Sequence, residues 1–182
     1  MALDINALAK DTWKLFEAKP LDHILAGFAV GVLSVITLGV LSGPLYVGYI
    51  QMCEKQRRGE PIQFGDIFKG LERFGTSFVL MILLGLGVTL GFMLLVLPGL
   101  VLAAGWFFAF NFAALRNTSA VGSLGASWRL FRANTGPVLT VLLIDVLVGA
   151  VGGAVFPVTL VTTPLTVIFT TLVFAQLAPG EA

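Results

Sequence analysis

The basic residues of this chain are confined to three short stretches, and this confinement constrains the fold more than any other feature. All eleven Lys and Arg residues lie within residues 10–19, 55–73 and 116–132. The segments between and after these stretches consist almost entirely of Leu, Val, Ile, Phe, Gly and Ala. This alternation is typical of a chain that crosses a bilayer repeatedly and returns each time to the same side.

The composition argues against a soluble domain. Apolar residues make up 57% of the 182 residues, charged residues make up 12%, and the mean hydropathy is +0.96. This balance lies far from that of soluble proteins. A single Cys and a single His cannot form an intrachain disulfide or a zinc site. We therefore expect a membrane protein with no cofactor, no metal and no nucleic-acid partner.

A repeated unit divides the chain into modules at about 1–58, 59–117 and 118–178. Similar motifs occur at 13–17, 68–72 and 128–132, each led by an aromatic residue. A proline follows that aromatic residue by 31, 30 and 29 residues, at Pro44, Pro98 and Pro157. The spacing predicts a pseudo-threefold internal repeat with a turn at each of these prolines.

Each module opens with an amphipathic segment, in which apolar and charged residues separate at helical spacing. Aromatic rings beside Lys or Arg suit the headgroup zone of a bilayer, where the ring is half buried and the cation stays in water. A soluble connector helix packed on its neighbour is the alternative. The predicted membrane-surface residues are Trp13, Lys14, Lys69, Arg73, Trp128, Arg129 and Arg132.

Two apolar helices follow each amphipathic segment. The second module has residues 76–97 and 99–115, and the third has 137–156 and 157–177, each near the length that spans a hydrocarbon core. The first module is weaker, because residues 24–38 and 45–52 are short and could form one long helix. We favour two helices there, since Gly43 and Pro44 stand where the other modules turn.

The expected fold is therefore an all-α integral membrane protein of six transmembrane helices, arranged as three hairpins. This arrangement leaves every Lys and Arg on one face, which the positive-inside rule makes cytoplasmic together with both termini. The start of the chain does not resemble a cleavable signal peptide, so the first apolar segment is expected to serve as an uncleaved anchor. The predicted location is the bacterial cytoplasmic (inner) membrane.

Pairs of glycines four residues apart occur in the first helix of each hairpin. Such spacing clears one helical face, so that another backbone can approach closely. The predicted packing seams could join helices within one chain, which we favour, or between chains of a homo-oligomer. These glycines are Gly27, Gly31, Gly87, Gly91, Gly149 and Gly153.

Asp145 is the one acidic residue deep within an apolar segment. A carboxylate near the bilayer centre costs about 3 kcal/mol on insertion scales, which makes it a candidate for function. The alternative role, which we favour, is that Asp145 fixes helix packing, because a proton or cation relay usually needs several such groups. The remaining residues of this possible polar site are Asn111, Thr159, Thr163 and Thr166.

Several short motifs resemble those of the YciC-like group of uncharacterised bacterial six-helix membrane proteins. They lie at residues 43–48, 58–60, 64–68, 97–100 and 125–130, and the likeness covers about 21–177. This group is related to the membrane domain of some glycerophosphodiester phosphodiesterases. The resemblance implies a fold of six transmembrane helices and no particular activity.

No catalytic constellation is visible, because paired carboxylates or a His beside a nucleophile are missing. We expect a non-catalytic scaffold, accessory subunit or membrane-organising protein. Its expected partners are the lipid bilayer, with anionic lipid at the cytoplasmic face, and further copies of the chain or a larger membrane complex. The alternative is a channel or small transporter with a polar path at Asp145.

Overall fold

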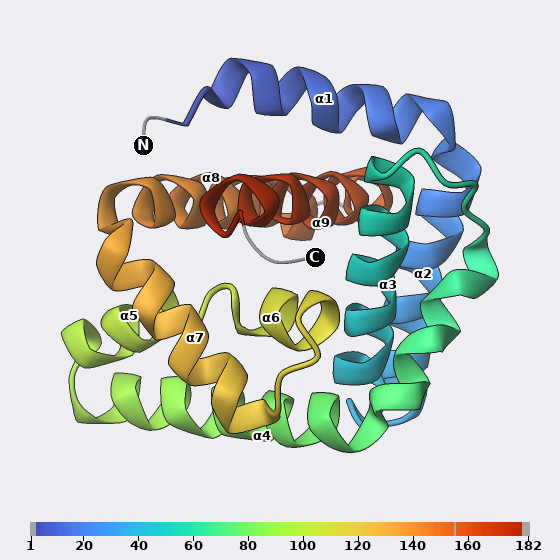
Figure 1. The fold of residues 1–182 in the computed structure, drawn as a ribbon. Helices are drawn as coiled ribbons and strands as arrows, with labels where there is room; N and C mark the ends of the chain where they lie inside the picture. Colours follow the sequence, from blue (N-terminus) through green and yellow to red (C-terminus); the bar gives the residue numbers. More distant parts are fainter. Residues whose placement is uncertain (1–2, 155, 180–182) are drawn as a thin grey trace.

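The computed structural model describes residues 3–154 and 156–179, without the side chains of residues 154, 156 and 157. Every element in this part of the chain is a helix (Figure 1). In chain order they are α1 (Ile5–Ala18), α2 (Pro20–Ile36), α3 (Ser42–Arg57), the 3₁₀ helix η1 (Phe64–Arg73), α4 (Phe74–Leu94), α5 (Val96–Gly105), α6 (Ala109–Leu115), α7 (Ala120–Ala133), α8 (Thr135–Ala154) and α9 (Phe156–Leu177).

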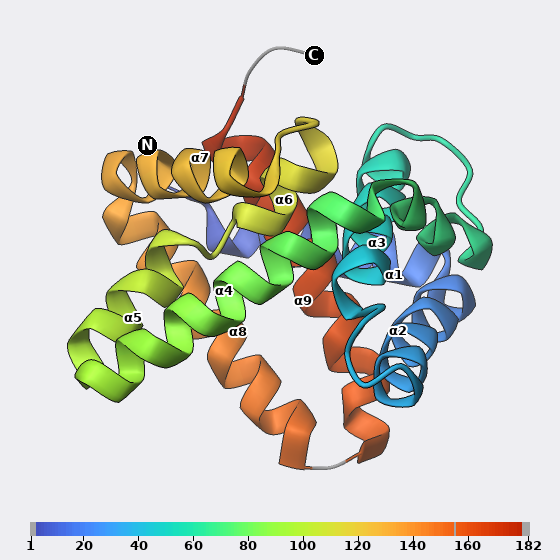
Figure 2. The same ribbon diagram turned by 90° about the horizontal axis from the view of Figure 1, so that it is seen from below.

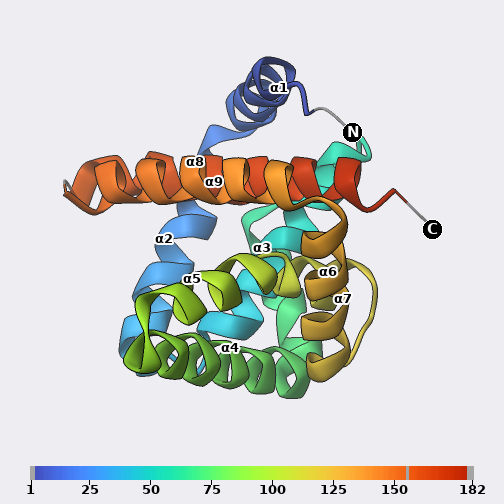
Figure 3. The same cartoon turned by 90° about the vertical axis from the view of Figure 1, so that its left-hand side faces the viewer.

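Three pairs of helices form the body of the molecule: α2 with α3, α4 with α5, and α8 with α9. The predicted amphipathic connectors α1, η1 and α7 precede these pairs, and a further helix, α6, lies between α5 and α7 in the chain. Figure 3 shows the C-terminal end of α9 on one side and the far ends of the α4–α5 and α8–α9 pairs on the other. The view from below agrees (Figure 2).

Four helical stretches are long and apolar enough to cross a membrane: Phe64–Leu94, Val96–Leu115, Thr135–Gly153 and Val158–Leu177. A fifth is obtained if α1 and α2, which meet at a bend of 94°, are taken as one segment. The chain is therefore an all-helical, multi-pass membrane protein. Of the six apolar spans predicted, four or five are found by length and composition.

Helix α3, the central helix of the fold, is not among these apolar stretches in either count. Most of its residues from Gly43 to Glu54 are buried, and it packs against α2, η1, α4, α6 and α9. A helix enclosed by protein can carry polar side chains, because they meet other helices rather than lipid. Residues 24–52 accordingly form two helices, as favoured, although the second is not an apolar one.

The helix pairs separate before the predicted prolines, not at them. A turn over residues 37–41 precedes α3 and leaves Pro44 as its third residue, and α5 starts at Val96 with Pro98 third. Proline fits the first helical turn, where its missing N–H would have no helical partner. Pro157 is the second residue of α9, but its side chain and residue 155 lie outside the described residues.

The predicted helix over 99–115 is broken into α5 and α6. At the break, the Ser127 hydroxyl of α7 donates to the Gly105 C=O (2.9 Å) and accepts from the Phe108 N–H (3.2 Å). One side chain thus satisfies two backbone groups that the break leaves unpaired. A hydroxyl inserted into the backbone ladder is an established cause of a helix kink, and the sequence pattern of α5 and α6 alone does not reveal it.

Candidate functional site

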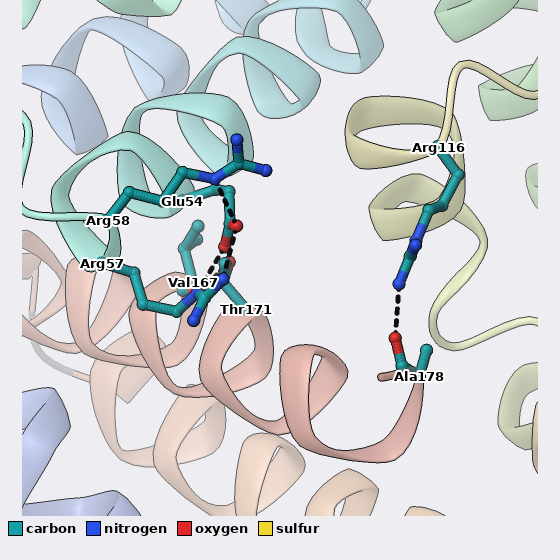
Figure 4. A network of polar contacts seen from close by, with 7 residues as sticks. All are labelled: Glu54, Arg57, Arg58, Arg116, Val167, Thr171 and Ala178. Carbon is teal, nitrogen blue, oxygen red and sulfur yellow. Dashed lines mark hydrogen bonds and ion pairs between the residues drawn. The ribbon is translucent and has the colours of Figure 1, made fainter. Parts of the chain in front are cut away.

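Two acidic residues on the charged side of the fold, Glu54 and Asp66, are held by neighbouring cations. Glu54, 7% exposed, accepts hydrogen bonds from Arg57 at 2.6 and 2.7 Å and from Arg58 at 2.9 Å (Figure 4). Burial opposes the ionisation of this carboxyl, but the two arginines outweigh burial and lower the pKa of Glu54. Near the end of α9, Arg116 donates to the Ala178 C=O (Figure 4).

A second acidic centre fastens η1 to α3. Asp66 forms ion pairs with Lys55 at 3.0 Å and Lys69 at 2.8 Å, and it accepts from the Gln63 N–H at 3.0 Å. The last contact belongs to a capping box that starts η1. The Phe64 N–H, which follows Gln63 in the chain, donates to the carboxylate of Asp22 in α2 at 2.9 Å. The start of η1 is therefore anchored to two helices.

His23 lies at the centre of a buried polar cluster that joins α1, α2 and α3. Its side chain is fully buried, with Nε2 2.7 Å from Gln56 Oε1 and Nδ1 3.2 Å from the Tyr49 hydroxyl. The Gln56 amide also donates to the Leu15 C=O of α1 at 2.8 Å. That bond turns Oε1 toward the histidine, so Nε2 carries the proton. The Tyr49 hydroxyl lies 3.2 Å from Nδ1 and also donates to the His23 C=O at 3.2 Å.

The predicted membrane-surface residues divide into bound and free side chains. The bound side chains are Lys69, which pairs with Asp66, and Arg73, which donates to the Ala113 C=O at 2.7 Å and to Asn117. Trp128 packs its ring over Gly105. Lys69 is exposed as well as paired, and the exposed members outside η1 are Trp13, Lys14, Arg129 and Arg132, from α1 and α7. None of the ion pairs found within residues 3–154 and 156–179 involves these three cations.

The predicted glycine seams are used unevenly. A Cβ on Gly27 would lie 3.3 Å from Pro164 of α9, one on Gly87 2.3 Å from the Trp106 ring, and one on Gly91 2.9 Å from Gly99. These three glycines therefore pack within the chain. No described atom lies within 4 Å of the corresponding position at Gly31, Gly149 or Gly153.

The closest helix contact involves two glycines outside those ladders. A Cβ on Gly48 of α3 would lie 1.8 Å from the Ile67 C=O oxygen, and one on Gly70 of η1 would lie 2.0 Å from the Pro44 C=O oxygen. Backbone meets backbone here, so neither position has room for a side chain. Gly48 and Gly70 belong to different modules, and a search for glycines four residues apart does not pair them.

The predicted polar residues near Asp145 do not share one path. Asp145 lines a cavity of about 220 Å³ with Thr166, between α1, α8 and α9. Thr159 and Thr163 line a separate cavity of about 340 Å³, between α2 and α9. Asn111 lines neither cavity; it is buried in α6, and its Nδ2 has no hydrogen-bond partner among the described residues.

Groups of three His, Cys, Asp or Glu residues that could hold a metal ion do not occur in the described part of the chain. Comparison of the chain with known protein families, curated proteins and solved structures finds no match. The resemblance to YciC-like proteins therefore stays a prediction. The fold and its apolar helices define a multi-pass membrane protein with a charged, amphipathic face.

Proposed function

We propose that this chain is a non-catalytic protein of the bacterial cytoplasmic membrane that acts by assembly, as a scaffold, accessory subunit or membrane-organising protein. The observation that carries the proposal is the uncompensated positive charge of α7. This helix has two exposed arginines, Arg129 and Arg132, beside Trp128 and no acidic residue. The ion pairs described on this face join Glu54 and Asp66 to cations outside α7, so α7 offers its charge to an anionic lipid headgroup or to an acidic partner.

Three parallel hairpins with both termini in the cytoplasm complete the proposal. The three connectors and all eleven basic residues then lie on the cytoplasmic side, as the positive-inside rule requires. Open glycines at Gly149 and Gly153 leave room on α8 for a second copy or another membrane subunit. The transporter alternative receives less support, because its candidate polar residues line separate cavities.

Anionic lipid binding is tested best on α7. We expect Arg129→Gln with Arg132→Gln to weaken phosphatidylglycerol binding roughly 25-fold, since each cation near an anionic surface contributes about 1 kcal/mol. Native mass spectrometry of the purified protein would measure the lipid bound. The matched control, Lys10→Gln with Lys14→Gln, removes the same charge from α1, where Asp11 and Glu17 already offset it, and should have a smaller effect. Equal losses in the two variants would contradict a site on α7.

The topology is tested by cysteine labelling of intact and inverted vesicles. Leu38, 93% exposed in the turn before α3, and Glu60, exposed in the loop after it, lie at opposite ends of that helix. We expect Glu60→Cys to react with an impermeant maleimide only from the cytoplasmic side and Leu38→Cys only from the other. The native Cys53 is buried and gives a low background. Labelling of both positions from one side would refute the hairpin.

A further inference from the structure

The cavity of about 340 Å³ between α2 and α9 has the form of a wedge. The two helices meet where a Cβ on Gly27 would lie 3.3 Å from Pro164, and α2 then leads away from the α8–α9 pair (Figures 1 and 3). The side of α2 that lines the cavity runs from Gly27 to Ile36, which is about 14 Å of helix. On α9 the lining lies just before the contact, between Thr159 and Thr163.

The walls of this wedge carry no charge. Residues 24–53 and 146–178, which include every residue of the lining, contain no Asp, Glu, Lys, Arg or His. The Thr159 hydroxyl donates to the Gly152 C=O at 2.6 Å, so its proton is already used within the chain. The rest of the lining is mostly Gly, Val, Leu, Ile and Phe. A ligand in the wedge is therefore recognised by apolar contact and not by a charge.

The size of the wedge decides between a helix and a hydrocarbon chain. Two turns of helix, about 10 Å wide and 11 Å long, occupy roughly 850 Å³, which is more than twice the space present. A cavity of about 150 Å³ holds the six carbons of benzene, so about 340 Å³ holds about 13 carbons. No described atom lies within 4 Å of the Cβ position at Gly31, so the wedge stays open along α2.

We propose that one acyl chain of a membrane phospholipid lies in this wedge, over Gly31, and completes the packing of α2 on α9. Helices in a bilayer are held together by close packing, because lipid gives them little hydrophobic reason to associate. An unfilled wedge would deprive both walls of contacts, and a flexible chain restores them. The site is independent of the function proposed for α7, because it binds the chain of the lipid and not its headgroup.

The test titrates the full-length protein in detergent micelles with palmitoyl-oleoyl phosphatidylcholine, and native mass spectrometry counts the lipid bound. Dihexanoyl phosphatidylcholine, which has the same headgroup and much shorter chains, is the matched probe. We expect half-saturation by the long-chain lipid at a mole fraction in the micelle about tenfold lower than by the short-chain lipid, because each buried methylene adds to affinity. The variant Arg129→Gln with Arg132→Gln should bind the long-chain lipid unchanged, which separates this site from α7.

Gly31→Leu should fill the wedge and raise the half-saturating mole fraction about tenfold, and Leu160→Trp should do the same from the α9 wall. Gly85→Leu is the matched control, because it makes the same change outside the wedge at a glycine of α4 with no described atom within 4 Å. Unchanged binding by Gly31→Leu and Leu160→Trp, an equal loss in Gly85→Leu, or equal binding of the two lipids would overturn the proposal. A dimer that persists without lipid and dissociates in Gly31→Leu would also overturn it, because a second copy would then occupy the wedge.

Discussion

Replacement of Gly48 by alanine is expected to lower the free energy of unfolding by more than about 3 kcal/mol. Overpacking a core usually costs about 1–3 kcal/mol because neighbouring side chains can move. Here the new methyl group would meet backbone, at 1.8 Å from the Ile67 C=O oxygen and 3.0 Å from the Gly70 N. Helices α3 and η1 would have to separate, and the capping contacts of Asp66 would be strained with them.

The measurement is a reversible SDS titration of the protein in mixed micelles. Gly149→Ala is the matched control, because it introduces the same methyl group in a helix where no described atom lies within 4 Å. That variant should stay within about 0.5 kcal/mol of the unaltered protein. Gly70→Ala should resemble Gly48→Ala, since both act on one contact. A Gly48→Ala protein as stable as the control would show that α3 and η1 do not approach this closely.

The hydropathy and charge of the sequence predicted the outward-facing helices of the fold better than its central helix. Helices α4 and α8 have apolar windows that are only 17% buried, so most of their side chains face outward and hydropathy identifies them directly. Helix α3 is enclosed by five other elements and carries Gln51, Glu54 and Gln56. A polar helix of this kind is recognisable only from its partners, which lie in other modules.

Spacing along one helix also predicted only part of the packing. Gly27, Gly87 and Gly91 pack against other parts of the described chain. A Cβ on Gly152 would lie 2.1 Å from Thr162 Oγ1, whereas no described atom lies within 4 Å of the same position at the predicted Gly153. The rotation of α8 about its axis decides which glycine faces α9. The candidate polar residues were scattered for the same reason. Asp145 and Thr166 are brought together, whereas Thr159 and Thr163 turn toward α2.

Loss of the His23 ring is expected to have the second largest effect. His23→Leu should lower the free energy of unfolding by about 2 kcal/mol, because it leaves Gln56 Oε1 without a partner inside the protein, whereas the Tyr49 hydroxyl keeps the backbone C=O of residue 23. A buried polar group left unpaired costs about 1–3 kcal/mol. Leucine keeps the position apolar and of similar bulk, so the loss would come mainly from the hydrogen bonds.

The same SDS titration separates this cluster from simple packing. Tyr49→Phe removes one hydroxyl and leaves the His23–Gln56 bond in place, so it should cost only about 1 kcal/mol. Because Gln56 also holds the Leu15 C=O, His23→Leu should loosen α1 and raise the reactivity of a cysteine placed at Thr12, which is 4% exposed. A His23→Leu protein as stable as the unaltered one, with Thr12→Cys still protected, would mean that the ring only fills space.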